Sequence, residues 1–196
     1  SAETDGDKDP RSPTEIIKEG TQAVLDIMRD PDLEGEEHEE KRREMLREAV
    51  SHMFDWRAMA RSSLAQHWRD RTEAEKEEFT RLFRKLLEET YLKRIRRNTD
   101  AELRYADEEI DGDYATVSTV AITRNGSQVP IKYRMEKVSE KQREENPKLP
   151  RWQVDNVSVE GVSLVNNYRA QFRNILIGSS YEDLVRKLRA KVEKDD

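Results

Sequence analysis

The hydrophobic pattern of this 196-residue chain changes its period near Asn98, and this change constrains the fold more than any other feature. Before that point, apolar residues recur every three or four positions, which is the spacing of one face of an α-helix. After it, apolar and polar residues alternate in stretches separated by Asp111-Gly112 and Asn125-Gly126, dipeptides that favour two-residue hairpin turns. A block of helices followed by hairpins predicts an α+β domain, with helices gathered on one face of an antiparallel sheet.

Start signals and apolar stripes predict four helices before the change. Ser12 and Thr72 each open a capping box, in which a Glu follows three positions later and bonds back to the start of the helix. Asp55 is a candidate N-cap between them. The first helix is expected to end near Pro31, and the fourth, over residues 73–97, has the longest apolar stripe in the chain and a basic C-terminal end.

The alternating pattern predicts four strands, at residues 101–110, 114–123, 129–138 and 151–160. In the third strand, apolar side chains point to one face and charged side chains to the other, so one face of the sheet is expected to meet solvent. A charged loop at residues 139–150 precedes the fourth strand, Gly161 ends that strand, and two helices follow, the second from Tyr181. The prediction is a four-stranded antiparallel sheet packed on one face by about six helices.

The length of the chain fits a single domain, which we place at residues 12–196. Residues 1–11 are polar and have no periodic apolar positions. They are therefore expected to form a flexible N-terminal tail.

Composition excludes several classes of function. Charged residues make up 40% of the chain, and 42 acids against 36 bases give a net charge of −6, which indicates solvated helix faces and argues against nucleic acid as a partner. No apolar run approaches the roughly 18 residues that a membrane span needs. The chain has no cysteine, which excludes disulfides, thiolate catalysis and cysteine-bound metals.

The usual catalytic and metal-binding motifs are missing from the sequence. His38, His52 and His67 form no pair at helical spacing, so no zinc site is predicted. Ser163 follows a Gly-Val step but lacks the second Gly of a nucleophile elbow, and the chain has no Gly-rich phosphate loop. We therefore predict no catalytic residue, no metal and no enzymatic activity.

Residues 152–172 form the most specific motif in the chain. They read as a strand, a Gly turn and an amphipathic helix: Trp-Gln-Val-Asp-Asn-Val-Ser-Val-Glu-Gly-Val-Ser-Leu-Val-Asn-Asn-Tyr-Arg-Ala-Gln-Phe. This order resembles the C-terminal signature of the MlaC-type toluene-tolerance family, in which a strand with Trp and Asp leads into Gly-Val-Ser-Leu and Asn-Tyr-Arg-x-x-Phe. Residues 54–61 also follow the family's helical pattern, and the resemblance covers about residues 12–178. The loop at 139–150 is longer and more charged than the turn expected for the family.

The resemblance implies a fold and a function. The fold would be a curved sheet packed against helices, similar to NTF2-like domains, with an apolar cavity between sheet and helices. The protein would be a soluble, monomeric, periplasmic phospholipid carrier of an outer-membrane lipid-asymmetry system. It would have no cofactor apart from the bound phospholipid. Its partners would be an outer-membrane lipoprotein complex and an inner-membrane MCE-domain ABC transporter.

The resemblance and the apolar stripes together indicate two groups of site residues. The acyl tails are expected to contact Met59, Phe79, Phe83, Leu86, Leu87, Tyr91, Val129, Ile131, Tyr133, Met135, Val154, Leu164, Tyr168, Phe172 and Ile175. The headgroup or a membrane surface is expected to contact the basic end of the long helix, at Lys93, Arg94, Arg96 and Arg97. The alternative for these cations is that they complement the helix C-terminus.

Three alternatives to phospholipid transport remain open at this point. One is a periplasmic carrier of another lipid, such as a hopanoid. Another is an NTF2-like enzyme, which would need a buried carboxylate with a raised pKa in its cavity. The third is a helical interaction module whose interior is filled by side chains.

Overall fold

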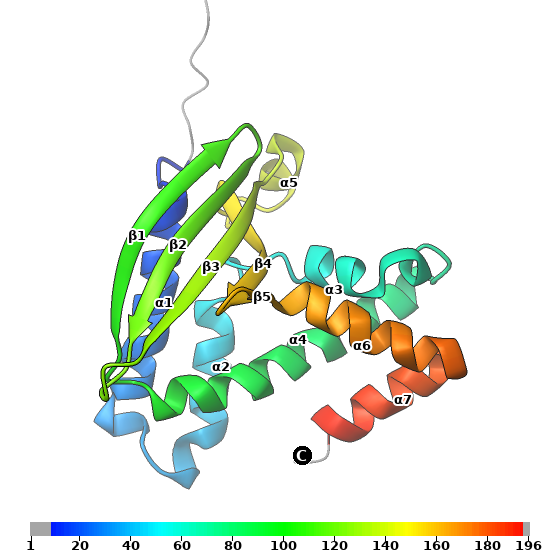
Figure 1. Ribbon diagram of the computed structural model, residues 1–196, viewed down its shortest axis with the longest axis horizontal. Coiled ribbons are helices and arrows are strands. Elements are labelled where there is room, and N and C mark those ends of the chain that lie inside the picture. The colour runs from blue at the N-terminus through cyan, green and yellow to red at the C-terminus, as the bar shows by residue number, and fades with distance from the viewer. Residues whose placement is uncertain (1–8, 194–196) are drawn as a thin grey trace, which may run out of the picture.

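The computed structural model describes residues 9–193 and confirms the predicted α+β architecture (Figure 1). Four helices precede the sheet: α1 (Pro13–Arg29), α2 (Glu39–Ala49), α3 (Trp56–Leu64) and α4 (Glu73–Arg97). Short 3-10 turns lie between them at Pro31–Leu33, Glu36–His38 and Ala65–Trp68.

The predicted helix starts are confirmed. Ser12 Oγ accepts a hydrogen bond from the Glu15 N–H at 3.1 Å, and Thr72 Oγ1 accepts one from the Glu75 N–H at 3.1 Å. The Asp55 carboxylate caps α3 in the same way. Each cap satisfies an N–H group that has no partner inside its helix, and the cap and its partner lie within one turn of sequence.

Five antiparallel strands follow in chain order: β1 (Glu102–Asp111), β2 (Tyr114–Ile122), β3 (Gln128–Lys137), β4 (Trp152–Val159) and β5 (Val162–Ser163). Both predicted hairpins are present, and their turns place Gly112 at a φ of 60° and Gly126 at a φ of 85°, a region that favours glycine. Two helices complete the fold: α6 (Leu164–Gly178) and α7 (Tyr181–Val192).

Two short elements differ from the prediction. β5 adds a fifth strand, because the chain turns through Glu160 and Gly161, both at positive φ, and folds back onto β4. α5 (Glu140–Glu145) lies in the segment predicted to be a loop, and Ser139 caps it. Neither element buries an apolar stripe, so hydrophobic periodicity has no signal for either.

The buried apolar side chains form two clusters. The first lies among α3, α4, α6 and α7 and includes Phe79, Phe83 and Phe172. The second joins α1 to the inner face of the sheet, and Phe54 and Tyr91 pack against both clusters. Figure 1 shows the sheet and α1 on the left, α6 and α7 on the right, and α4 extending from one part to the other.

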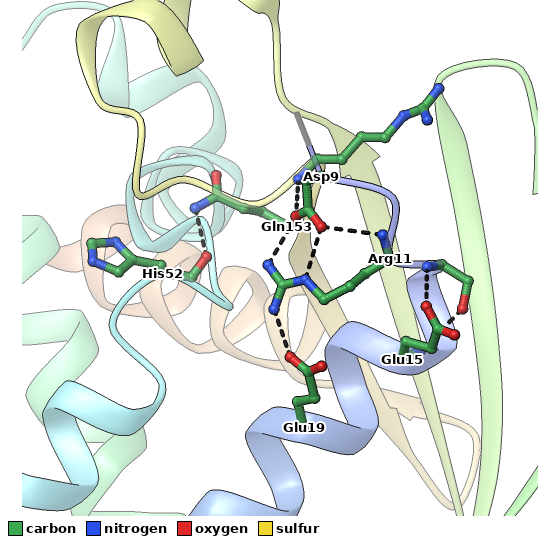
Figure 2. A network of polar contacts seen from close by, with 8 residues as sticks. Asp9, Arg11, Glu15, Glu19, His52 and Gln153 are labelled. Carbon is green, nitrogen blue, oxygen red and sulfur yellow. Dashed lines mark hydrogen bonds and ion pairs between the residues drawn. The ribbon is translucent and has the colours of Figure 1, made fainter. Parts of the chain in front are cut away.

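A polar network joins the start of the described chain to the sheet (Figure 2). The Asp9 carboxylate accepts hydrogen bonds from the Arg11 guanidinium at 2.8 Å and from the Arg151 N–H, just before β4, at 3.1 Å. Arg11 also pairs with Glu19 of α1 at 2.6 Å. Asp9 and Arg11 belong to the segment expected to be a tail, and residues 1–8 of that segment lie outside the described residues.

One edge of β4 pairs with β3, and the segment that precedes α3 covers the start of the opposite edge. The Gln153 side chain donates to the His52 carbonyl at 2.9 Å (Figure 2). The Val154 N–H donates to the Met53 carbonyl, and the Val154 carbonyl accepts from the Asp55 N–H. The start of β4 therefore has partners on both sides, which fixes the sheet relative to α3.

Candidate functional site

A cavity of about 590 Å³ lies between the inner face of the sheet and helices α1, α2 and α4. Its apolar lining comes from α1 (Val24 and Leu25), from α2 and the segment after it (Leu46, Val50, Met53 and Phe54), from α4 (Leu87, Leu92 and Ile95) and from the sheet (Leu103, Ala121, Val129, Ile131, Val157 and Val159). Its volume falls within the range of roughly 300–1,000 Å³ typical of ligand pockets.

The strand period of two builds the sheet wall of this cavity. Val129, Ile131 and Tyr133 of β3 lie on one face, and Tyr133 pairs with Val157 of β4 across the sheet. Thr119 is a buried polar residue on the same face, and its hydroxyl donates to the Ile131 carbonyl at 2.9 Å. The buried Thr119 hydroxyl is therefore satisfied within the sheet and is not part of the cavity lining.

Gly20 allows α1 to approach the segment before α3 closely. A Cβ at position 20 would overlap the Sδ of Met53. Both residues line the cavity, so this contact closes one side of it.

Tyrosine hydroxyls supply polar groups in the cavity without charge. Burial raises the pKa of Tyr133 to about 12, and a hydrogen bond with Thr21 opposes that shift only in part. Burial also raises the pKa of Tyr91. Both rings therefore stay neutral at physiological pH, and the wall formed by Thr21, Tyr133 and Tyr91 offers hydrogen bonds but no ionic partner.

Charged residues mark where the cavity opens to solvent. Arg43, Arg47, Arg94, Arg97 and Glu160 line the cavity and are exposed. The Arg47 guanidinium pairs with the Glu88 carboxylate of α4 at 3.0 Å. The Arg94 guanidinium lies 5.7 Å from the centre of the Tyr91 ring, a cation–π contact at the boundary between the charged rim and the apolar interior.

The structure brings about half of the predicted tail-contact residues to the cavity. Those that line it are Met59, Leu87, Tyr91, Val129, Ile131, Tyr133 and Leu164. Those in the helical cluster instead are Phe79, Phe83, Leu86, Tyr168 and Phe172, with Ile175 packed against them. Met135 and Val154 are fully buried in the sheet cluster.

Aromatic packing accounts for the residues that the cavity does not include. The Phe79 ring meets the Phe172 ring edge to face at 5.7 Å, and the Phe83 ring meets the Tyr168 ring edge to face at 5.6 Å. These rings hold α6 against α4. A ring that fills the space between two helices is not available to line a cavity, so these side chains are part of the helical core.

The basic end of α4 divides into two pairs. Arg94 and Arg97 line the cavity, whereas Lys93 and Arg96 are exposed and lie outside its lining. Successive residues of an α-helix are rotated by about 100°, so Arg94 and Arg97, three positions apart, share a face.

Sequence reasoning did not assign the α1 and α2 residues to the site. Val24, Leu46 and Val50 do lie on the apolar stripes of their helices. The stripes predicted that these side chains would be buried but carried no information on whether they would meet another side chain or a cavity. Leu103 and Ala121 were missed for the same reason on the sheet.

Within residues 9–193, no three His, Asp or Glu side chains are close enough to one another to hold a metal ion. In the same part of the chain, no helix combines the length and the apolar composition needed to cross a membrane.

The sequence model of the MlaC protein family matches residues 18–190. The chain belongs to the MlaC family. This confirms the resemblance carried by residues 54–61 and 152–172. No curated protein sequence matches the chain.

The MlaC fold is also found among solved structures. The structure of a phospholipid-binding protein from Ralstonia solanacearum, in complex with a phospholipid, matches with a TM-score of 0.78 and 20% sequence identity. The match covers 94% of this chain and 98% of that one. The two proteins therefore share a fold over nearly their whole lengths.

Proposed function

We propose that this protein is a phospholipid carrier, which holds acyl tails in the cavity between the sheet and helices α1, α2 and α4. The observation that carries the proposal is the cavity itself: an apolar interior of about 590 Å³ that ends at exposed charges. Such a lining suits a ligand with an apolar body and a charged head. The Ralstonia relative of the same fold, which was solved with a phospholipid, supports this choice of ligand.

The energetics explain why such a carrier is needed. Burying a methylene group is worth about 0.8 kcal/mol, so moving one tail of roughly 16 carbons through water would cost on the order of 12 kcal/mol. An apolar cavity offsets that cost. No bond is made or broken in this function, so no catalytic group is required.

The wider role that we propose follows from membership of the family. The protein would work as a periplasmic monomer and shuttle lipid between an outer-membrane lipoprotein complex and an inner-membrane MCE-domain ABC transporter. The chain has no phosphate-binding loop, so ATP would be used by another subunit. Direction would follow from the relative affinities of the successive carriers.

An NTF2-like enzyme is the competing hypothesis from a different class. It requires a carboxylate with a raised pKa in the cavity. Burial does raise the pKa of Asp155 to about 6, but Asp155 is not among the residues that line the cavity. The apolar lining favours the carrier.

Mass spectrometry of lipid extracted from natively purified protein tests the proposal. We expect near-stoichiometric diacyl phospholipid. A hopanoid in place of phospholipid would support a lipid carrier with a different ligand. Protein purified without any lipid would contradict the carrier proposal.

A cavity-filling variant and its matched control test where the ligand binds. Ala121→Trp places an indole inside the cavity from β2, and Ser118→Trp places the same group on the opposite face of that strand. We expect Ala121→Trp to lose lipid and Ser118→Trp to keep it. Equal lipid content in the two folded variants would place the ligand elsewhere.

A further inference from the structure

A second pocket, of about 310 Å³, lies where the outer face of the sheet meets α3 and α6. It shares no lining residue with the apolar cavity. On β3, Arg134 and Glu136 line this pocket, and they alternate with Tyr133 and Met135, which point to the opposite face of the sheet. The lining is almost entirely polar, in contrast to that of the cavity.

Three arginines from three different elements meet at this pocket: Arg61 of α3, Arg134 of β3 and Arg169 of α6. The Arg169 Nε–H donates to the Ser62 carbonyl at 2.7 Å, which orients its guanidinium. The Arg134 guanidinium lies 5.0 Å from the centre of the Tyr114 ring. Among residues 9–193, no ion pair involves Arg61 or Arg169, so their remaining N–H groups are available to a ligand.

Asp155 lines the pocket from a bulge in β4. The register of β4 shifts here, since Arg134 pairs with Asn156 while the next residue of β3, Met135, pairs with Val154, which leaves Asp155 on a bulge. Its side chain is 14% exposed. Within the described part of the chain, its buried Oδ1 has no hydrogen-bond partner, and the Arg134 Nε is 3.6 Å away.

The groups around Asp155 have opposing effects on its charge. Burial is the largest influence and raises its pKa to about 6; Arg134 lowers the pKa, and the carboxylates of Glu136 and Asp55 raise it. Arg61 and Arg169 face the same pocket from α3 and α6. Asp155 is therefore a carboxyl group that takes up a proton close to neutral pH.

We propose that this pocket is an anion-binding site, in which Arg61, Arg134 and Arg169 hold a carboxylate or phosphate group and Asp155, in its neutral form, donates a hydrogen bond to that group. Guanidinium groups match the planar, paired oxygens of such anions. A protonated Asp155 carries an O–H donor that needs an acceptor, and an anion in the pocket supplies one. The lining holds three arginines against two carboxylates, so protonation of one carboxylate increases its positive charge.

The pocket is built by the two segments that place the chain in its family. Arg61 belongs to residues 54–61, and Asp155 and Arg169 belong to residues 152–172. These segments are far apart in sequence, and the fold joins their polar side chains here rather than at the apolar cavity.

Sulfate and acetate are suitable probes for a phosphate group and a carboxylate. Each would be titrated into the full ¹⁵N-labelled chain while the arginine Nε–Hε signals are followed by NMR. We expect saturable shifts at the pocket arginines, and affinity weakened about tenfold or more in Arg61→Gln and in Arg169→Gln, the loss expected when a charge-assisted hydrogen bond is removed. Arg173→Gln removes an exposed arginine of α6 outside the pocket and should bind as wild type.

The pH dependence of sulfate binding tests the role of Asp155, since sulfate keeps its charge between pH 5 and 8. Wild-type affinity should fall as pH rises above 6, by up to about tenfold per pH unit, because binding then requires uptake of a proton. Asp155→Asn carries an amide N–H donor at every pH, so its affinity should stay level. If the affinity of Asp155→Asn for sulfate falls with pH as that of the wild type does, Asp155 does not take part in the site.

Vesicles distinguish the two sources of the anion. If the group is a lipid headgroup phosphate, sulfate and Arg169→Gln should each reduce sedimentation with phosphatidylglycerol vesicles; if it is a free anion, sedimentation should not change while sulfate binding persists. Sulfate and acetate that produce no saturable shift at any pH, or that bind Arg61→Gln as tightly as wild type, would overturn the proposal. Because the two pockets share no residue, that result would leave the lipid carrier proposal intact.

Discussion

The carboxylate of Asp9 accepts a hydrogen bond from the backbone N–H of Arg151 at 3.1 Å, across 142 residues of chain. The Arg11 guanidinium also donates to this carboxylate, and that hydrogen bond is the largest of the effects that lower the pKa of Asp9 to about 2. This contact joins the residues before α1 to the start of β4, and it fixes one end of the helix that forms a wall of the cavity (Figure 2).

Asp9→Asn should destabilise the fold by about 1.5–3 kcal/mol at pH 7, the range for a hydrogen bond to a charged group. A lowered folded-state pKa means that the stabilisation is present above the unfolded pKa of 3.8 and is lost as pH falls toward 2. Urea unfolding at pH 7 and at pH 2.5 measures both effects. Asp107→Asn, on the exposed part of β1, is the matched control and should match wild type at both values.

Tyr133→Glu should leave the protein folded and remove its lipid. Tyr133 lines the cavity, so a carboxylate there would lie where the acyl chain is proposed to bind, and water can enter to solvate it once the lipid is absent. Circular dichroism and extracted lipid measure the two properties. Lys132→Glu points to the opposite face of β3 and should keep its lipid. An unfolded Tyr133→Glu would instead show that the ring belongs to a solid core.

Reversing charges on α4 separates headgroup contact from general attraction to a membrane. Each cation near an anionic surface is worth about 1 kcal/mol. We expect the double variant of Arg94→Glu and Arg97→Glu, at the cavity opening, to slow lipid transfer to anionic vesicles at low salt more than the double variant of Lys93→Glu and Arg96→Glu. Transfer assays with fluorescent lipid measure the rates. Equal slowing by the two double variants would indicate attraction to the membrane alone. Unchanged transfer rates would indicate that all four cations only stabilise the C-terminal end of the helix.

Asp155→Asn should stabilise the protein in alkaline but not in acidic solution. A raised folded-state pKa means that the folded form binds the proton more tightly, so the contribution of Asp155 to stability is fully present below the unfolded pKa of 3.8 and is lost as pH rises through about 6. The shift corresponds to roughly 2–3 kcal/mol. We expect Asp155→Asn to unfold at higher urea than wild type at pH 8 and to differ little at pH 4. Lower stability of Asp155→Asn at pH 8 would show that the carboxylate is favourably paired.

Local contacts explain why much of the fold could be predicted. The capping boxes at Ser12 and Thr72 and the turns at Gly112 and Gly126 depend on residues only a few positions apart. The sequence alone is therefore enough to predict them. α4 has the predicted bounds, since both of its ends carry such signals. β5 has only two residues, and α5 has no apolar residue, so neither could be found from periodicity.

Apart from α5 and β5, the sequence by itself determined the order of helices and strands, the faces of each that would be buried, and the family to which the chain belongs. Only the tertiary structure decided which buried side chains meet a cavity. Leu86 and Leu87 are adjacent, equally apolar and both part of the helical cluster, but only Leu87 also lines the cavity. A hydrophobic pattern records that a side chain avoids water, but what it meets instead depends on how α4 lies between α7 and the sheet. Likewise, Arg61 and Asp155 come together only because α3 packs beside β4, a contact that neither segment encodes on its own.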